Sequence, residues 1–299
     1  MKTLQANRSL LRKPAKRRHY DSAFKRHLVE LTLVPGASVA RIALDHRVNA
    51  NILFRWRRHY LREVAPDVLC LQEIKSTDEA FPRLEIEDAG YNAAVHGQKG
   101  WNGVAILSKR PIEVSRGLPG DESDIHARYI EATVPNDTNN VIRVASIYLP
   151  NGNPPNTDKY AYKLDWMDRL IAHAQSLLTL EEPLVIAGDY NVIPGPVDVY
   201  DPANWGGDAL YLPTTRERFR ALLNLGFIDS LRAVTDAPGI YTFWDYQAGA
   251  WQRNRGLRID HLLLSPMAAD RLQSVAIDKK MRENDKPSDH VPIMTEFAF

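Results

Sequence analysis

The sequence has a single cysteine, Cys70, and no apolar run that approaches the roughly 20 residues of a membrane-spanning helix. One cysteine excludes an internal disulfide, and with it the disulfide-stapled class of small secreted proteins. The N-terminus is basic but lacks the apolar segment of a secretory signal, and internal repeats and low-complexity tracts are also absent. We therefore expect a cytoplasmic protein with no membrane partner. Its 299 residues can hold one large core with a small module attached.

Acidic residues are scarce at the N-terminus. Residues 1–60 carry 14 Lys and Arg against 3 Asp and Glu, a net charge of +11, whereas residues 61–299 carry 24 against 34, a net charge of −10. This asymmetry, hidden in a total of +1, indicates two parts with different partners. We predict a basic flexible tail over residues 1–20, a helical segment over 21–61 and a second domain over 62–299.

The helical segment has the features of a helix-turn-helix. Phe24 and Leu28 have helical spacing, Pro35 stops that run, and two further helices follow. The third helix carries Arg55, Arg57 and Arg58 opposite its apolar face, and a basic third helix is the element that enters the DNA major groove. Through residues 20–26, 35–43 and 49–58, the segment resembles the N-terminal DNA-binding part of insertion-sequence transposases. A charged helical bundle without a DNA role is the alternative.

The second domain is organised around a continuous apolar run over residues 184–187, followed by Gly188, Asp189, Tyr190 and Asn191. Such a run predicts a strand that is buried on both faces. Asp189 and Asn191 are two residues apart, so in strand geometry their side chains project to the same side. A carboxylate beside a carboxamide suits a metal ion or an activated water. An ordinary Asx turn is the alternative.

Other strands also end in polar side chains. Strands are predicted over 65–74, 103–108, 128–134, 141–149 and 257–265, a last strand after His290, and helices over 158–180 and 214–225. The polar side chains at these ends are Glu73, Tyr148, Asp189, Asn191, Asp260, Asp289 and His290. Asp260 stands among apolar neighbours and therefore needs a partner. Because α/β sheets gather strand ends at one rim, these oxygen-rich groups favour Mg²⁺ or Mn²⁺ and the hydrolysis of a phosphate ester.

Six motifs resemble, in order, those of exodeoxyribonuclease III, a family within the endonuclease/exonuclease/phosphatase superfamily. They are Leu71-Gln-Glu-Ile-Lys75, Trp101-Asn-Gly-Val-Ala105, Ile147-Tyr-Leu-Pro150, Gly188-Asp-Tyr-Asn191, Arg258-Ile-Asp-His261 and Ser288-Asp-His290. The resemblance runs from about Arg62 to the end of the chain. It implies a four-layered α/β sandwich, with two sheets face to face and helices outside. It also implies a monomer that cleaves double-stranded DNA with Mg²⁺ or Mn²⁺, at abasic sites and from 3′ ends.

The same resemblance implies a role for each site residue. The metal ligands would be Glu73, Asp189, Asn191 and Asp289. Asp189 would also deprotonate the attacking water, while Asn191 holds the phosphate. His290, polarised by Asp260, would stabilise the charge that develops on the phosphorane, and Tyr148 would donate a hydrogen bond. The DNA contacts would come from Arg128 and from Trp251, Arg253 and Arg255, which lie in an aromatic and basic loop over 241–256.

The sequence departs from the family at its start. The family opens with a strand that ends in a Trp-Asn-Val-Asn type of motif, whose Asn joins the metal site, and nothing before Ala65 matches it. We therefore expect the strand over residues 68–72 to lack its neighbour, with weaker metal binding, activity and thermal stability. Two alternatives to a repair nuclease stay open. One is an inactive fusion that only binds DNA through its helices. The other is a member of the same superfamily that acts on a phospholipid or an inositol phosphate, against which the loop from Trp251 to Arg255 argues.

Overall fold

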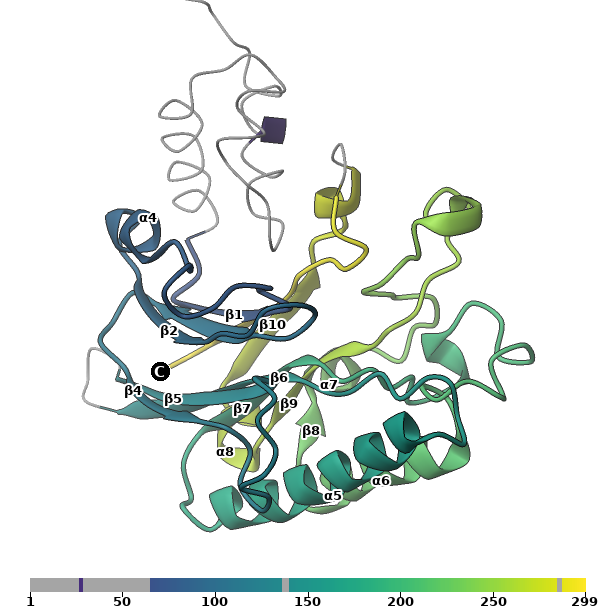
Figure 1. The fold of residues 1–299 in the computed structure, drawn as a ribbon, viewed down its shortest axis with the longest axis horizontal. Helices are drawn as coiled ribbons and strands as arrows, with labels where there is room; N and C mark the ends of the chain where they lie inside the picture. Colours follow the sequence, from purple (N-terminus) through teal and green to yellow (C-terminus); the bar gives the residue numbers. More distant parts are fainter. Residues whose placement is uncertain (1–26, 29–64, 136–139, 284–286) are drawn as a thin grey trace, which may run out of the picture.

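The structure is a computed structural model that describes residues 27–28, 65–135, 140–283 and 287–299. The predicted tail and helix-turn-helix, with Arg55, Arg57 and Arg58, lie outside the described residues apart from His27 and Leu28. In the rest of the chain, a six-stranded sheet is covered by α5 (Asp158–Leu178) and α6 (Pro213–Asn224) on one face (Figure 1). Two smaller sheets cover its other face. The α/β sandwich expected from the sequence is therefore confirmed.

The large sheet has the strand order β4-β5-β6-β7-β9-β8. Its strands are β4 (Glu113–Arg116), β5 (Tyr129–Pro135), β6 (Val141–Tyr148), β7 (Leu184–Asp189), β8 (Ile228–Asp229) and β9 (Asp260–Leu264). Only β6 and β7 pair in parallel, and all other neighbours are antiparallel. Helix α5 connects these two strands, as a parallel pair requires a crossover connection. The strands predicted over 128–134, 141–149, 184–187 and 257–265 are all present.

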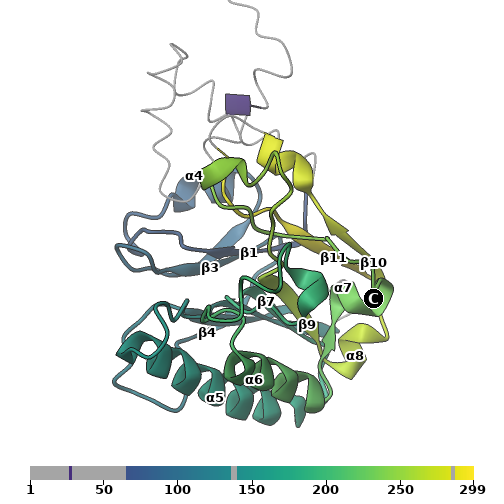
Figure 2. The same ribbon diagram turned by 90° about the vertical axis from the view of Figure 1, so that its right-hand side faces the viewer.

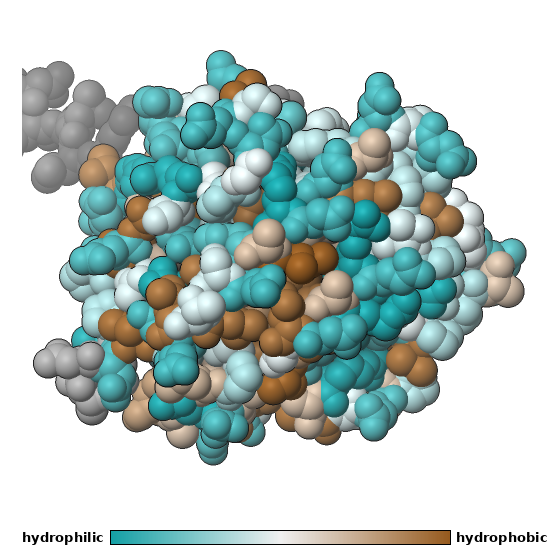
Figure 3. Space-filling model, turned by 90° about the horizontal axis from the view of Figure 1, so that it is seen from below, coloured by the Kyte–Doolittle hydropathy of each residue, from teal (hydrophilic) through white to brown (hydrophobic). Residues whose placement is uncertain are grey.

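Helix α5 closes the core under this sheet. Trp166, Met167, Leu170 and Ala174 repeat at three- and four-residue intervals and are buried against the sheet, as is Ile186 of β7. Each large apolar side chain buried in this way contributes ~1.5–3 kcal/mol. Figure 3 shows the face of the molecule on the side where helices α5 and α6 lie. Apolar side chains gather near the middle of this face, and hydrophilic side chains surround them. No helix among the described residues has the length and apolar composition needed to cross a bilayer.

The second layer consists of two separate pieces. One is a three-stranded sheet of β1 (Val68–Gln72), β3 (Val104–Ser108) and β2 (Asn92–His96), and the other is the pair β10 (Leu272–Ile277) and β11 (Ile293–Phe297). Figure 2 shows β1 and β11 both lying above β7 and β9. Cys70 of β1 and Ile293 of β11 pack against the same buried cluster, which includes Ala187 and Leu262.

Strand β1 has a neighbour on one side only among the residues that the structure describes. Lys109 N donates to Asp67 O at 3.1 Å, so Asp67 occupies a hydrogen-bonded position of this antiparallel pair, and Leu69 and Leu71 occupy the next two. Because the pattern alternates, the backbone groups of Val68, Cys70 and Gln72 face away from β3. All five residues of β1 are partly exposed. Within this part of the chain, β1 therefore has one paired edge and one unpaired edge, and the loss of a neighbouring strand stays a prediction.

Strand β11 presents a second open edge. Asp278 N donates to Pro292 O at 3.0 Å, so Pro292 occupies a hydrogen-bonded position, and every second residue of β11 after it also faces β10. By the same rule, the backbone groups of Ile293, Thr295 and Phe297 face away from β10. Two strand edges thus stand over β7 and β9 without a backbone partner in the described ranges.

The sequence did not predict several short elements. They are the strands β2, β4, β8 and β10 and the helices α4 (Arg83–Asp88), α7 (Ser230–Val234) and α8 (Pro266–Ala269). Each is short, and β10 alternates poorly between buried and exposed residues. Such segments take their structure from their neighbours rather than from their own pattern.

Candidate active site

Strand register places three predicted site residues in one line across the large sheet. Tyr148 is aligned with Asp189 in the parallel β6–β7 pair, and Asp189 is aligned with Asp260 in the antiparallel β7–β9 pair. Tyr148 and Asp189 are the last residues of their strands, whereas Asp260 is the first residue of β9. The predicted rim exists, and the antiparallel strand contributes its beginning rather than its end.

Asp260 has the partner that its buried position requires. Its two carboxylate oxygens lie 3.0 and 2.9 Å from His290 Nδ1. Phe243 packs against the imidazole of His290, with ring centroids 5.0 Å apart. Burial alone lowers the pKa of His290, but the attraction of Asp260, with that of Asp189 and Asp289, outweighs it and raises the pKa above its ordinary value. The pair therefore presents a positively charged imidazole at the rim.

Asp189 and Asn191 form an Asx turn and also lie in the site. Asn191 donates from its backbone N to Asp189 Oδ1 at 2.8 Å and from Nδ2 to Asp189 Oδ2 at 3.0 Å. A second bond from Nδ2 reaches Leu149 O at 2.9 Å, and Asn191 Oδ1 accepts from Asn151 Nδ2 at 2.9 Å. The Asx turn, which was the alternative interpretation of this stretch, is thus present. The amide of Asn191 is occupied in orienting the carboxylate of Asp189.

Asp189 sits in an environment that favours its protonated form. Burial raises the pKa of its carboxyl above the ordinary value, and the carboxylates of Asp260 and Glu73 act in the same direction. The charge of His290 and the hydrogen bond from the backbone of Asn191 partly oppose this effect. A carboxylate with a raised pKa is a stronger proton acceptor than an exposed one, which suits a general base.

Glu73 joins the line through Tyr148. The hydroxyl of Tyr148 donates to Glu73 Oε1, and Lys75 Nζ lies 3.0 Å from Glu73 Oε2. Burial raises the pKa of Tyr148, and the carboxylates of Asp189 and Glu73 raise it further, so its hydroxyl stays a neutral donor. Lys75 also lies over the ring of Trp101, 4.4 Å from its centroid. The side chain of Trp101 is itself well exposed.

The described residues contain no group of three or more His, Cys, Asp or Glu side chains arranged to hold a metal ion. The predicted ligands Glu73, Asp189 and Asp289 therefore do not form a ready-made cage. Mg²⁺ usually binds through one or two carboxylates and keeps several waters, so a cage is not needed. Glu73, whose side chain is 32% exposed, is a hard oxygen donor that fits such a loosely held ion.

The predicted DNA contacts differ in how they are held. Arg128 lies over the ring of Tyr148, 4.7 Å from its centroid, and donates to Tyr148 O at 3.2 Å, so it belongs to the site. Arg253 and Arg255 are exposed. Trp251 packs edge-on against Trp244, with centroids 4.8 Å apart, and is partly buried. Its ring is therefore engaged within the protein.

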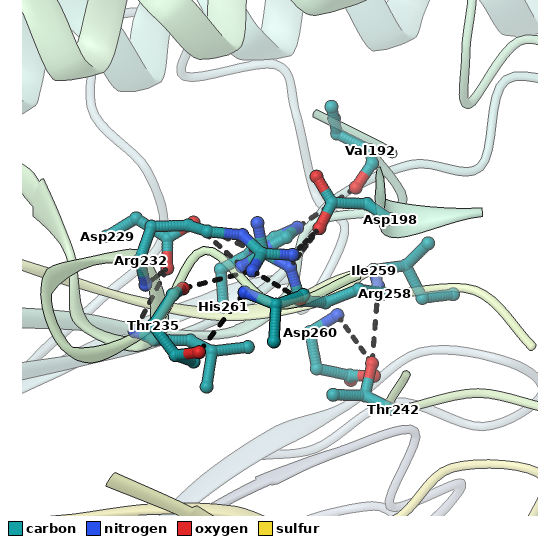
Figure 4. A network of polar contacts seen from close by, with 12 residues as sticks. Val192, Asp198, Asp229, Arg232, Thr235, Thr242, Arg258, Ile259, Asp260 and His261 are labelled. Atoms are coloured by element: carbon teal, nitrogen blue, oxygen red, sulfur yellow. Dashed lines mark hydrogen bonds and ion pairs between the residues drawn. The ribbon is translucent and has the colours of Figure 1, made fainter. Parts of the chain in front are cut away.

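A network of buried ion pairs and hydrogen bonds connects the chain segments that carry the site residues (Figure 4). Arg258 is almost completely buried and bonds Asp198 and Asp229, each at 2.7 Å. Arg258 Nη1 lies 2.9 Å from Nδ1 of His261, whose Nε2 lies 2.9 Å from Val192 O. The network therefore connects the start of β9, which carries Asp260, to the segment that follows β7 and to the last residue of β8.

Sequence reasoning missed three groups that surround the site. Lys75 holds Glu73, and Arg258 was taken only as part of a motif. Lys163 is fully buried although its charge argues for the surface. Its position was a usable signal, because Lys163 precedes Met167 by four residues and Leu170 by seven, on the apolar face of α5.

Comparison with known proteins identifies related chains. Residues 49–290 match the sequence model of the endonuclease/exonuclease/phosphatase family. Exodeoxyribonuclease III of Haemophilus influenzae is 36% identical over 259 residues, covering 81% of this chain and 96% of that protein. The structure of an AP endonuclease from Archaeoglobus fulgidus gives a TM-score of 0.77 at 36% identity, covering 82% and 94% of the two chains. A 3′ phosphatase from Neisseria bound to a product DNA hairpin gives 0.78 at 36% identity, covering 83% and 95%.

Proposed function

The chain belongs to the endonuclease/exonuclease/phosphatase family, and we propose that it is a DNA-repair nuclease of the exodeoxyribonuclease III type. The observation that carries this proposal is the continuous row of Glu73, Tyr148, Asp189, Asp260 and His290. Hydrolysis of a phosphodiester needs a base for the water and positive charge for the phosphorane. Asp189 and His290 offer the corresponding groups.

Within this proposal each residue acts through its observed contacts. Asp189, oriented by Asn191, accepts the proton of the attacking water. His290 carries the positive charge and is held by Asp260, so it stabilises the charge that develops on the phosphate oxygens. Tyr148 keeps its proton and donates to a phosphate oxygen when its present acceptor, Glu73, is engaged elsewhere.

Glu73 would hold a divalent cation, Mg²⁺ or Mn²⁺, with waters and substrate oxygens completing the coordination. Such an ion supplies additional positive charge to the phosphate. Asp289 would bind this ion or steer it into the site.

The proposed substrate is double-stranded DNA, at abasic sites and 3′ ends. Support comes from relatives whose names include exodeoxyribonuclease III, AP endonuclease and a 3′ phosphatase bound to DNA. Arg128 at the site and the exposed Arg253 and Arg255 would pair with the backbone phosphates. Residues 21–61 would act as an added DNA-binding arm. The family match begins at residue 49, inside this predicted arm, so the boundary at residue 62 stays a prediction.

The test is cleavage of a duplex that carries one abasic site by the full-length chain with Mg²⁺. We expect nicking that stops with a chelator, and D189N should lower the rate by ~10²–10⁴ while DNA binding stays unchanged. The matched control is D168N, because Asp168 is an exposed aspartate of α5 that pairs with Arg218 at 2.8 Å, away from the row. Cleavage by D189N within tenfold of the parent would remove Asp189 from the role of base.

The second candidate, a catalytically inactive DNA-binding fusion, is favoured by one observation, the open edge of β1 next to Glu73. Retained DNA binding without any nicking by the parent chain would support it over the nuclease. Release of phosphate from a phospholipid or an inositol phosphate, without DNA cleavage, would instead support the third hypothesis.

A further inference from the structure

The side chain of Lys163 extends from α5 to the backbone of Asn191, next to Asp189 of the active-site row. Its side chain is fully buried, and Nζ donates to Asn191 O at 2.6 Å and to Asn151 O at 3.0 Å. Asn191 belongs to the turn that orients Asp189, and Asn151 follows β6, two residues beyond the bond between Leu149 N and Asp189 O. The amino group of one side chain thus joins the two segments that follow the parallel strands β6 and β7.

The surroundings of Lys163 are shaped to its side chain. Gly152 has a φ of +85°, and a Cβ atom added there would lie 2.6 Å from Lys163 Cδ. A residue with a side chain at position 152 would therefore collide with the lysine stem and would also be strained. The site accommodates a long linear side chain that ends in a hydrogen-bond donor.

Asn191 depends on this contact because of its backbone conformation. Its φ of 48° is in the left-handed region, which costs a non-glycine residue of order 1 kcal/mol or more. In this conformation its carbonyl points at Lys163, while its N and Nδ2 bond Asp189 and its Oδ1 accepts from Asn151. Without a donor at position 163, the buried carbonyl group of Asn191 would lose the bond that Lys163 supplies, and the partly buried carbonyl group of Asn151 would lose its bond as well.

We propose that Lys163 is a positioning residue, which fixes the turn of Asn191 and thereby the direction of the Asp189 carboxylate. Lys163 itself touches no reacting atom. A lysine inside an apolar helix face costs stability unless it serves a contact, so a plain packing role would be met better by methionine. The inference rests on the proposed nuclease function for its kinetic test, and it predicts that activity depends on Lys163 more strongly than folding does.

The experiment compares K163M and K163Q with the parent chain in the abasic-site assay. Methionine keeps the length of the side chain and removes the donors, whereas glutamine keeps an amide donor. We expect K163M to fold, with a tenfold to hundredfold lower kcat and a KM within threefold, because a misplacement of about 1 Å can cost 10²-fold in rate. K163Q should recover part of kcat. The control R220M removes an exposed positive charge from α6 and should keep the parental kcat.

The outcomes separate this inference from the proposed function. A folded K163M with the parental kcat would overturn the positioning role and leave the nuclease assignment intact. An unfolded K163M would also overturn it, because folding would then depend on Lys163 at least as strongly as activity does. A parent chain that cleaves nothing would refute the nuclease function instead. In that case a crystal structure of K163M decides. Bonds from Asn191 N and Nδ2 to Asp189 that stay near 3 Å, with φ unchanged, would overturn the inference, and a rearranged turn would support it.

Discussion

Filling the gap between β1 and β11 should stabilise this protein and restore its metal site. We consider a chain in which residues 1–60 are replaced by a strand that ends in Trp-Asn-Val-Asn, followed by a helical connection to Ala65. The terminal Asn must reach the end of β1 that leads to Glu73, so the new strand has to run parallel to β1. A parallel neighbour requires a crossover of a dozen or more residues, which the helical connection supplies.

The magnitude follows from the open edges. Val68, Cys70 and Gln72 on one side and Ile293, Thr295 and Phe297 on the other offer backbone groups to the new strand. Each hydrogen bond contributes ~0.5–1.5 kcal/mol, and ordering each residue of the strand costs ~1–2 kcal/mol, so these two effects nearly cancel. Roughly three inward side chains at ~1.5–3 kcal/mol each then leave about 5 kcal/mol. For a domain of this size, that stabilisation corresponds to a Tm increase of about 10–20 °C.

Thermal unfolding followed by circular dichroism measures the stabilisation, and the Mg²⁺ concentration for half-maximal nicking measures the metal site. A second graft, with Ala in place of the last Asn, separates the two effects. Both grafts should raise Tm, and only the graft with Asn should lower the Mg²⁺ requirement. Unchanged Tm in both grafts, or full activity of the unmodified chain at ordinary Mg²⁺, would refute the reasoning.

Three further predictions address other parts of the chain. Deleting residues 1–60 should reduce the slope of log K against log salt by ~0.9 for each phosphate that this segment neutralises, and an unchanged slope would show that the segment does not touch DNA. Burial, followed by the charge of Arg258, lowers the pKa of His261 to about 4. The imidazole of His261 therefore takes up a proton near pH 6.5 in the unfolded chain, but only near pH 4 in the native protein. Chemical denaturation should thus show stability falling by up to ~3 kcal/mol as the pH drops between these values, and H261Q, which cannot take up the proton, should flatten the curve. A Cβ added to Gly188 would lie 2.1 Å from Ile147 O, so G188A should lose at least ~4 kcal/mol, whereas G206A meets nothing within 4 Å and should keep its Tm; equal melting of the two variants would contradict this account.

The sequence by itself determined the local parts of this protein. Continuous apolar runs predicted β6, β7 and β9, and the helical spacing of Met167 and Leu170 predicted α5. The turn at Asp189 and Asn191 could be predicted because its hydrogen bonds join residues two apart. The need of Asp260 for a partner also followed from its apolar neighbours. Each of these inferences depends on interactions within a short stretch of chain.

The tertiary structure decided which distant residues meet. The contact between Tyr148 and Glu73 joins residues 75 positions apart, and it depends on how β1 packs over β6. The burial of Lys163 beneath Asn191 depends equally on the seating of α5 against the sheet. Strand register and side-chain packing, rather than local preference, determine such contacts, because many pairings would satisfy the same apolar pattern. The division of the second layer into two pieces follows the same logic. The sequence predicts that a strand is missing beside β1, and only the packed structure shows which two strand edges are unpaired among the described residues.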